Sequence, residues 1–348
     1  MSIQLLHSLL RLALTSPDSH PITRIQAEIE AATSKDWKRC IEAMQHHRLL
    51  PLIAYALTEN HLSPMVPQPY CDRLMSAHHQ TKTENTINLL TLEGILRKME
   101  QHHLHPILWK GIVLADTFYP HPSTRPMGDI DFAIPSDELE AATEVFESLG
   151  LKQQHDATTE DAVYFANSFG VVCDVHHRVR LFEDKTSLKL TAQLKPQHTK
   201  ATTFPVLEPN AMVAHLVFHM NGHYDETGPV LLWLLDLAFV LRKWGQLLEP
   251  DKLQQLLPSD EYFTSLCRVV RFLEEAFDES FPQWLSQASR KVPPLTLAEI
   301  LQQRYWAIWQ LDSPRGWLKL IAHKLGFLPT LVKLLGKKSI VTSISGAS

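Results

Sequence analysis

Residues 128–134, Gly-Asp-Ile-Asp-Phe-Ala-Ile, alternate carboxylates with large apolar side chains. Because successive side chains of a β-strand point to opposite faces, Asp129 and Asp131 share one face while the apolar residues share the other. The apolar face predicts a buried strand packed against helices. The two carboxylates would repel each other, and a divalent cation such as Mg²⁺ or Mn²⁺ would relieve that repulsion. The segment therefore predicts a strand that binds a metal ion within a folded core.

A third carboxylate occurs in a second apolar strand, residues 171–177, Val-Val-Cys-Asp-Val-His-His. Alternation places Asp174 on the same face as His176. We expect His176 and His177 to flank the site. Three carboxylates on neighbouring strands make a two-metal site possible, with Asp129, Asp131 and Asp174 as the ligands.

A lysine–glycine turn precedes these strands. Residues 106–110 read as a short strand that ends at Gly111, where a short helix begins. The missing side chain of Gly111 would let a phosphate approach the backbone, and a helix start offers free N–H groups. Lys110 and Arg125 could supply positive charge to a triphosphate, although each also fits a surface or pairing role. Gly128, directly before the paired aspartates, completes this set of candidate phosphate-binding residues.

The secondary structure pattern divides the chain into three parts. Apolar residues at helical spacing dominate the first 80 residues and return after about residue 208, whereas residues 104–180 alternate strand-like and helical segments. We therefore predict an N-terminal helical region (1–80), an α/β core (81–205) and a C-terminal helical domain (206–348). The fold class is α+β, with a short mixed sheet and flanking helices.

Composition excludes several classes of protein. The chain has 348 residues, 45% of them apolar, and 33 basic residues stand against 38 acidic ones, for a net charge of −5. This balance argues against an extended nucleic-acid-binding surface. The four cysteines form no CxxC pair, which fits a reducing compartment, and no apolar run is long enough to span a membrane. We expect a cytoplasmic protein.

Histidines recur every fourth residue at His215, His219 and His223, so they could line one face of a helix. A zinc site is one interpretation, but no HExxH motif and no fourth ligand is nearby. A polar stripe against neighbouring helices is the favoured interpretation. A third possibility is that His219 and His223 face the site and contact substrate or phosphate.

Asp236 lies in an almost wholly apolar helix, so a buried partner is expected. Pairing with a lysine or arginine and a role in the site remain equally open. Near the C-terminus, residues 316–338 form a basic amphipathic segment. It is interpreted as a helix packed on the core, with a membrane or an acidic partner as the alternative.

The segments around residues 109–151 and 171–177 resemble nucleotidyltransferase-like proteins of the DNA polymerase β superfamily. The similarity is to the bacterial branch of uncharacterised nucleotidyltransferases and extends over about residues 30–245. It implies a polymerase β-like core embedded between helical regions. One departure is that Lys110-Gly111-Ile112 lacks the serine that usually follows the glycine in the wider superfamily.

The resemblance also implies an activity and roles for the carboxylates. Asp129 and Asp131 would be the paired metal ligands, and Asp174 the third ligand and the base near the attacking hydroxyl. A nucleoside triphosphate such as ATP would be the co-substrate, with Mg²⁺ or Mn²⁺ as cofactor. Its nucleoside monophosphate would pass to a hydroxyl of a small molecule, peptide or protein. The alternatives are a catalytically inactive binding or regulatory module and a phosphoryl transferase.

Overall fold

The computed structural model describes residues 2–14, 22–155, 158–178, 191–195, 197, 204–222, 230–297 and 300. His223 and the basic C-terminal segment lie outside these residues, so the predictions made for them stay untested. None of the described helices is long and apolar enough to cross a membrane.

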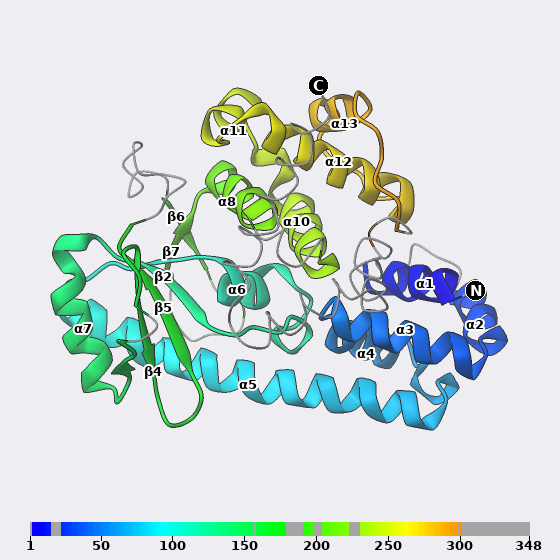
Figure 1. Cartoon of the computed structure of the whole chain (residues 1–348), viewed down its shortest axis with the longest axis horizontal. Helices are drawn as coiled ribbons and strands as arrows, with labels where there is room; N and C mark the ends of the chain where they lie inside the picture. The colour runs from blue at the N-terminus through cyan, green and yellow to red at the C-terminus, as the bar shows by residue number, and fades with distance from the viewer. Residues whose placement is uncertain are drawn as a thin grey trace, which may run out of the picture.

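Four helices at the N-terminus pack together at one end of the molecule, shown in blue in Figure 1. They are α1 (Ser2–Leu14), α2 (Ile22–Ala31), α3 (Ser34–His46) and α4 (Leu50–Glu59). Helix α3 begins with a capping box, in which the Thr33 hydroxyl accepts from the Asp36 backbone and the Asp36 carboxylate accepts from the Thr33 backbone. Trp37 of α3 is fully buried, and the buried side chains of these helices belong to one hydrophobic core that continues into the sheet and the later helices.

The long helix α5 (Gln68–Gln101) connects this cluster to the rest of the chain, after the short turn η1 (Ser63–Met65). It runs along one side of the molecule and contacts α4, η3 and α7 in turn (Figure 1). The boundary expected at residue 80 falls inside α5. The division of the chain into three parts stays a prediction.

A seven-stranded mixed sheet forms the centre, in the order β3-β4-β5-β2-β1-β7-β6. Its strands are β1 (Ile107–Leu108), β2 (Ile130–Ala133), β3 (Lys152–Gln153), β4 (Ala162–Ala166), β5 (Val172–His176), β6 (Thr191–Leu194) and β7 (Phe204–Leu207). Strand β2 pairs parallel to β5 and antiparallel to β1. With helices and a mixed sheet in one chain, the α+β class is confirmed.

Short helical segments connect the first strands. They are α6 (Lys110–Val113), the π-helical turn η2 (Leu114–Phe118), η3 (Pro122–Thr124), η4 (Ser136–Glu138) and α7 (Leu139–Ser148). Helix α7 covers the apolar face of β2, where Phe146 contacts Phe132 edge-on at 5.5 Å and stacks on Phe165 at 4.6 Å between ring centroids. The opposite face of β2 is left for the carboxylates.

The remaining helices lie on the other side of the sheet (Figure 1). They are α8 (Pro209–Gly222), α10 (Leu231–Trp244), η7 (Gly245–Leu247), α11 (Pro250–Leu256), α12 (Asp260–Phe277) and α13 (Gln283–Ser289). Helix α8 contacts β7, α10, α11 and α12, and α10 also contacts η2. Helices α8 and α10 therefore bring C-terminal side chains close to the end of β1.

Candidate functional site

Two buried aspartates face each other at the centre of the sheet. In the parallel pairing of β2 with β5, Asp131 lies directly opposite Asp174. Their relative exposures are 3% and 6%. Because buried carboxylates need compensating partners, this pair requires positive charge nearby.

Lys110 supplies one positive charge. Its Nζ donates to Asp131 Oδ1 at 2.7 Å. Burial alone would lower the pKa of Lys110, but the negative charges of Asp131, Asp174 and Asp129 outweigh it and raise that pKa. The backbone of Lys110 has φ +49°, in the left-handed region that residues other than glycine seldom adopt. A strained turn thus aims this ammonium group at the carboxylates.

Asp129 precedes β2 and is half-buried. Its pKa is raised to about 6, first by burial and then by the negative charge of Asp131, with Asp174 adding to the effect and Lys110 and Arg125 opposing it. The three aspartates predicted from the sequence therefore interact through their charges. A cation bound among them would favour their ionised forms.

His176 completes a compact group of donor atoms. Its Nε2 lies 3.0 Å from Asp174 Oδ2. Among the described residues, Asp131, Asp174 and His176 each offer a ligand atom within 4.8 Å of the other two, and Asp129 lies outside that group. Asp174 Oδ1 is buried and has no hydrogen-bond partner in the described part of the chain. The two-residue spacing of Asp174 and His176 was the sequence signal for this placement.

A row of aromatic rings leads away from this group. Trp109 contacts His176 edge-on at 5.2 Å and stacks on His215 at 4.8 Å, with an interplanar angle of 7°. His219 follows at 6.4 Å from His215, and then Trp233 at 5.4 Å from His219. His219 therefore lies in the row, beyond His215 as seen from the carboxylates. Trp109 was not among the predicted site residues, although its position directly before Lys110 was an available signal.

His215 is the buried histidine of that row. Neither ring nitrogen has a hydrogen-bond partner in the described ranges. Burial, and then the positive charge of Lys110, lowers the pKa of His215 well below its usual value. The ring is therefore neutral near pH 7 and packs as an aromatic surface.

Arg125 is held by Asp236. Its Nε donates to Asp236 Oδ1 at 2.7 Å and its Nη2 to Oδ2 at 2.8 Å, and the Tyr119 hydroxyl donates to Oδ1 at 2.8 Å. Burial alone would lower the pKa of Arg125, but Asp236 reverses the effect and raises it. The partner of Asp236 is thus an arginine, one of the two possibilities considered for it. Whether Arg125 also meets a phosphate stays a proposal.

The two candidate glycines have different surroundings. A Cβ atom on Gly111 would lie 3.2 Å from Arg125 Nη1 and 3.5 Å from Met127 Cγ. Gly128 is exposed, and a Cβ atom there would meet nothing within 4 Å. A side chain at Gly111 would therefore pack tightly against Arg125, whereas one at Gly128 would meet open space.

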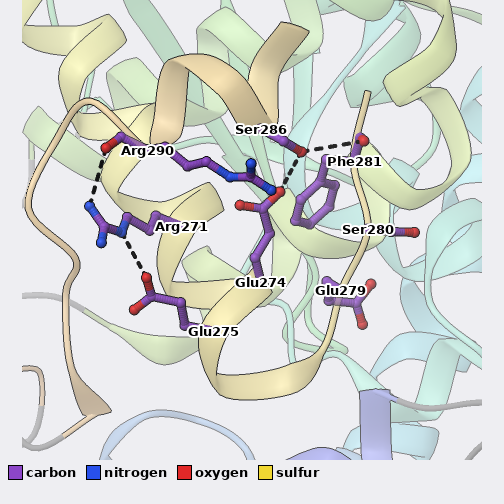
Figure 2. Close-up of a pocket in the computed structure, with 8 residues that line it drawn as sticks. All are labelled: Arg271, Glu274, Glu275, Glu279, Ser280, Phe281, Ser286 and Arg290. Carbon is purple, nitrogen blue, oxygen red and sulfur yellow. Dashed lines mark hydrogen bonds and ion pairs between the residues drawn. The ribbon is translucent and has the colours of Figure 1, made fainter. Parts of the chain in front are cut away.

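A cavity of about 380 Å³ lies elsewhere, along α12 and α13 (Figure 2). It is lined by Arg271, Glu274, Glu275, Glu279, Ser280, Phe281, Ser286 and Arg290. Three of its acidic groups have partners: Glu275 pairs with Arg271 at 2.7 Å, Glu279 pairs with Arg242, and Glu274 accepts from the Ser286 and Ser289 hydroxyls. Helices α12 and α13 lie apart from β2 and β5 (Figure 1), so this cavity does not belong to the carboxylate site.

Residues 33–278 match the sequence profile of a family described as uncharacterised nucleotidyltransferase. The match spans well over half of the chain. The chain belongs to this nucleotidyltransferase family. The family predicted from the lysine–glycine turn and the two carboxylate strands is confirmed. A comparison with curated proteins finds no significant match.

Three solved structures show a distant likeness. The solution structure of the antibiotic-resistance factor ANT(2'')-Ia is 13% identical, with a TM-score of 0.39 over 49% of this chain and 90% of that one. A crystal structure of ANT(2'')-Ia with adenylyl-2''-tobramycin is 11% identical, with a TM-score of 0.38 over 49% and 94%. An antigenic nucleotidyltransferase-like protein from Paracoccidioides brasiliensis is 12% identical, with a TM-score of 0.36 over 60% and 94%. Likeness at this level identifies no ligand or acceptor for the present chain.

Proposed function

We propose that the chain is a nucleotidyltransferase that depends on Mg²⁺ or Mn²⁺. It would move a nucleoside monophosphate from a nucleoside triphosphate to a hydroxyl of a small molecule, peptide or protein. The observation that carries this proposal is the register of β2 and β5, which sets Asp131 opposite Asp174 beside the ammonium group of Lys110. Membership of the nucleotidyltransferase family supports the class of reaction.

The residues of the site fit a divalent cation. Asp174 Oδ1 is a buried acceptor without a partner among the described residues, and an unpaired buried carboxylate oxygen is costly. The proposed ligands are Asp129, Asp131 and Asp174, whose oxygens suit Mg²⁺ and Mn²⁺. When bound, the metal ion would neutralise charge on the triphosphate and polarise its phosphorus–oxygen bonds.

The acceptor oxygen forms a bond to the α-phosphorus of the triphosphate. The bond from that phosphorus to the oxygen bridging the β-phosphorus breaks, and pyrophosphate leaves. The proton of the acceptor hydroxyl passes to the carboxylate of Asp174, which His176 contacts at Oδ2. Orientation and charge neutralisation then supply most of the rate.

Positively charged side chains and a glycine turn near the carboxylates would bind the phosphates. Lys110 would contact them directly, and the turn at Gly111 would let them approach the backbone. Arg125 would contribute positive charge beside Gly111, where its Nη1 lies 3.2 Å from the position that a Cβ atom of residue 111 would occupy. Gly128 and His219 are further candidates for contact with the nucleotide, as is His223, which lies outside the described residues.

A cytoplasmic location is proposed as well. It is supported by unpaired thiols at all four cysteines, as expected in a reducing compartment: Cys40, Cys71, Cys173 and Cys267.

The test is transfer from nucleoside triphosphates labelled at the α-phosphate. ATP, GTP, CTP and UTP are supplied in turn with Mg²⁺ or Mn²⁺ and candidate acceptors, and pyrophosphate release and label transfer are measured. The double variant Asp129→Ala/Asp131→Ala and the single variant Asp174→Asn should each abolish transfer. Asp137→Asn, an exposed aspartate outside the site, is the matched control and should leave transfer intact.

Other outcomes distinguish the alternatives. Transfer of a γ-phosphate label in place of the α-phosphate label would make the protein a phosphoryl transferase. Nucleotide-induced thermal stabilisation without any transfer would favour a binding module. Transfer that survives in the double variant would rule out the carboxylate mechanism.

A further inference from the structure

Strand β5 presents a nitrogen donor beside the two buried carboxylates. His176 follows Asp174 by two residues, so both side chains project from the same face of the strand. His176 Nε2 lies 3.0 Å from Asp174 Oδ2, and a ligand atom of Asp131 lies within 4.8 Å of both side chains' ligand atoms. Two carboxylates and one imidazole therefore converge on one point.

We propose that His176 is a metal ligand through Nε2, and that this nitrogen makes the site select a first-row transition-metal ion such as Mn²⁺ over Mg²⁺. The inference rests on the proposed function, because it concerns the cation that the carboxylates would hold. Mg²⁺ prefers oxygen ligands and gives up its water reluctantly, whereas imidazole suits transition metals. A site with mixed oxygen and nitrogen ligands therefore favours Mn²⁺ over Mg²⁺.

The position of the imidazole ring is fixed before any metal binds. Trp109, itself fully buried, packs edge-on against the ring with centroids 5.2 Å apart. The side chain of His176 is 21% exposed, so it is largely enclosed yet can be reached from solvent. Coordination through Nε2 requires the tautomer that carries its proton on Nδ1. A ring held in this way loses little conformational entropy when it coordinates an ion.

The competing role for His176 is purely positioning. Its hydrogen bond to Asp174 could orient that carboxylate while the nitrogen itself never touches the ion. Both roles predict that activity falls when His176 is replaced, so activity cannot separate them. The two roles can be separated only by a spectroscopic measurement that detects the nitrogen–metal bond itself.

The test is pulsed electron paramagnetic resonance of Mn²⁺ bound to the full-length protein, with and without α,β-methylene-ATP. We expect ¹⁴N coupling to the bound ion, and we expect it to become ¹⁵N coupling when the protein is labelled with ¹⁵N-histidine. His176→Gln should lose the coupling and reduce the preference for Mn²⁺ over Mg²⁺ by about tenfold. His102→Gln, the same change at an exposed histidine directly after α5, should leave both unchanged.

The outcomes separate this inference from the proposed function. Bound Mn²⁺ without nitrogen coupling, or coupling that survives in His176→Gln, would overturn the role of His176 while leaving the carboxylate site standing. If the wild-type protein binds no Mn²⁺ in either condition, the metal-dependent function falls too. The ¹⁵N-labelling experiment uses the wild-type chain, so it tests for a histidine ligand even if His176→Gln fails to fold. Among the described residues, His176 is the histidine in the group of ligand atoms that includes Asp131 and Asp174.

Discussion

Arg125 and Asp236 form a two-point ion pair in the protein interior, although 111 positions separate them in the sequence. Their side chains are 9% and 2% exposed. Arg125 belongs to the loop before β2, and Asp236 lies in the middle of α10. The pair therefore fastens a C-terminal helix to the loop that leads into the carboxylate strand.

Asp236→Ala should destabilise the protein by about 3–5 kcal/mol, because it leaves a buried guanidinium without its counter-ion. Urea denaturation followed by circular dichroism measures the change. Glu160→Ala, which removes one partner of the exposed Arg178–Glu160 pair, should cost less than about 1 kcal/mol. If the two changes lower the stability equally, the buried Arg125–Asp236 pair contributes no more than an exposed ion pair.

Gly111→Ala should lower the rate of nucleotidyl transfer by about tenfold or more. The new Cβ atom would lie 3.2 Å from Arg125 Nη1, and Arg125 is fixed by Asp236 and cannot yield freely. The matched control is Gly94→Ala in α5, where a Cβ atom would meet nothing within 4 Å. Steady-state pyrophosphate release compares the two variants. Unchanged activity in Gly111→Ala would show that the turn tolerates a side chain.

Substitutions at Lys110 separate its backbone from its ammonium group. With φ at +49°, glycine should fit this position better than alanine, so Lys110→Gly should be more stable than Lys110→Ala by about 1–2 kcal/mol. Both variants lose the ion pair with Asp131, so both should lose most transfer activity. Thermal unfolding measures the difference in stability, and transfer of the α-phosphate label measures the loss of activity. A Lys110→Gly variant less stable than Lys110→Ala would contradict the strained turn.

Asp129 should make the stability of the metal-free protein depend on pH. Its pKa is about 6 in the folded protein against 3.8 in a model compound. Between these values the folded state keeps a proton that the unfolded chain has released, so the contribution of Asp129 to stability falls as the pH rises from about 4 to about 6. The full penalty, about 3 kcal/mol, is then present above pH 6.

Comparison of the wild-type protein with Asp129→Asn isolates this effect. The melting temperature of the variant should rise relative to that of the wild type between pH 4 and about 6, and the difference should then level off. Asp137→Asn, at an exposed aspartate, should show no such trend. A difference in melting temperature that does not change across this range would mean that the fold does not raise the pKa of Asp129.

Much of the site follows from local sequence patterns. The alternation in residues 128–134 places Asp131 on the face opposite Phe132, and the same period in residues 171–177 places Asp174 with His176. A period of two is a property of any strand, so neither assignment needs the fold. The resemblance carried by these segments also led to the nucleotidyltransferase family, which the family profile confirms.

Local patterns did not predict contacts between residues that are distant in the sequence. Asp236, in an apolar helix, predicted a positively charged partner. The chain contains many lysines and arginines, so the sequence did not identify which one pairs with it. The role of Arg125 could not be chosen from its neighbours, because its guanidinium reaches α10 across the fold. Likewise, no local pattern predicted that Trp109 would pack edge-on against His176 and stack on His215.

The sequence by itself determined which residues face which side of each strand and that carboxylates would occupy a buried face. Only the tertiary structure decided that β2 and β5 pair in the register that sets Asp131 opposite Asp174, and that His176 joins them while Asp129 stays just outside. The physical reason is that strand periodicity is a local property of the backbone. Register and ion pairing depend on how the whole core packs, which no short segment encodes.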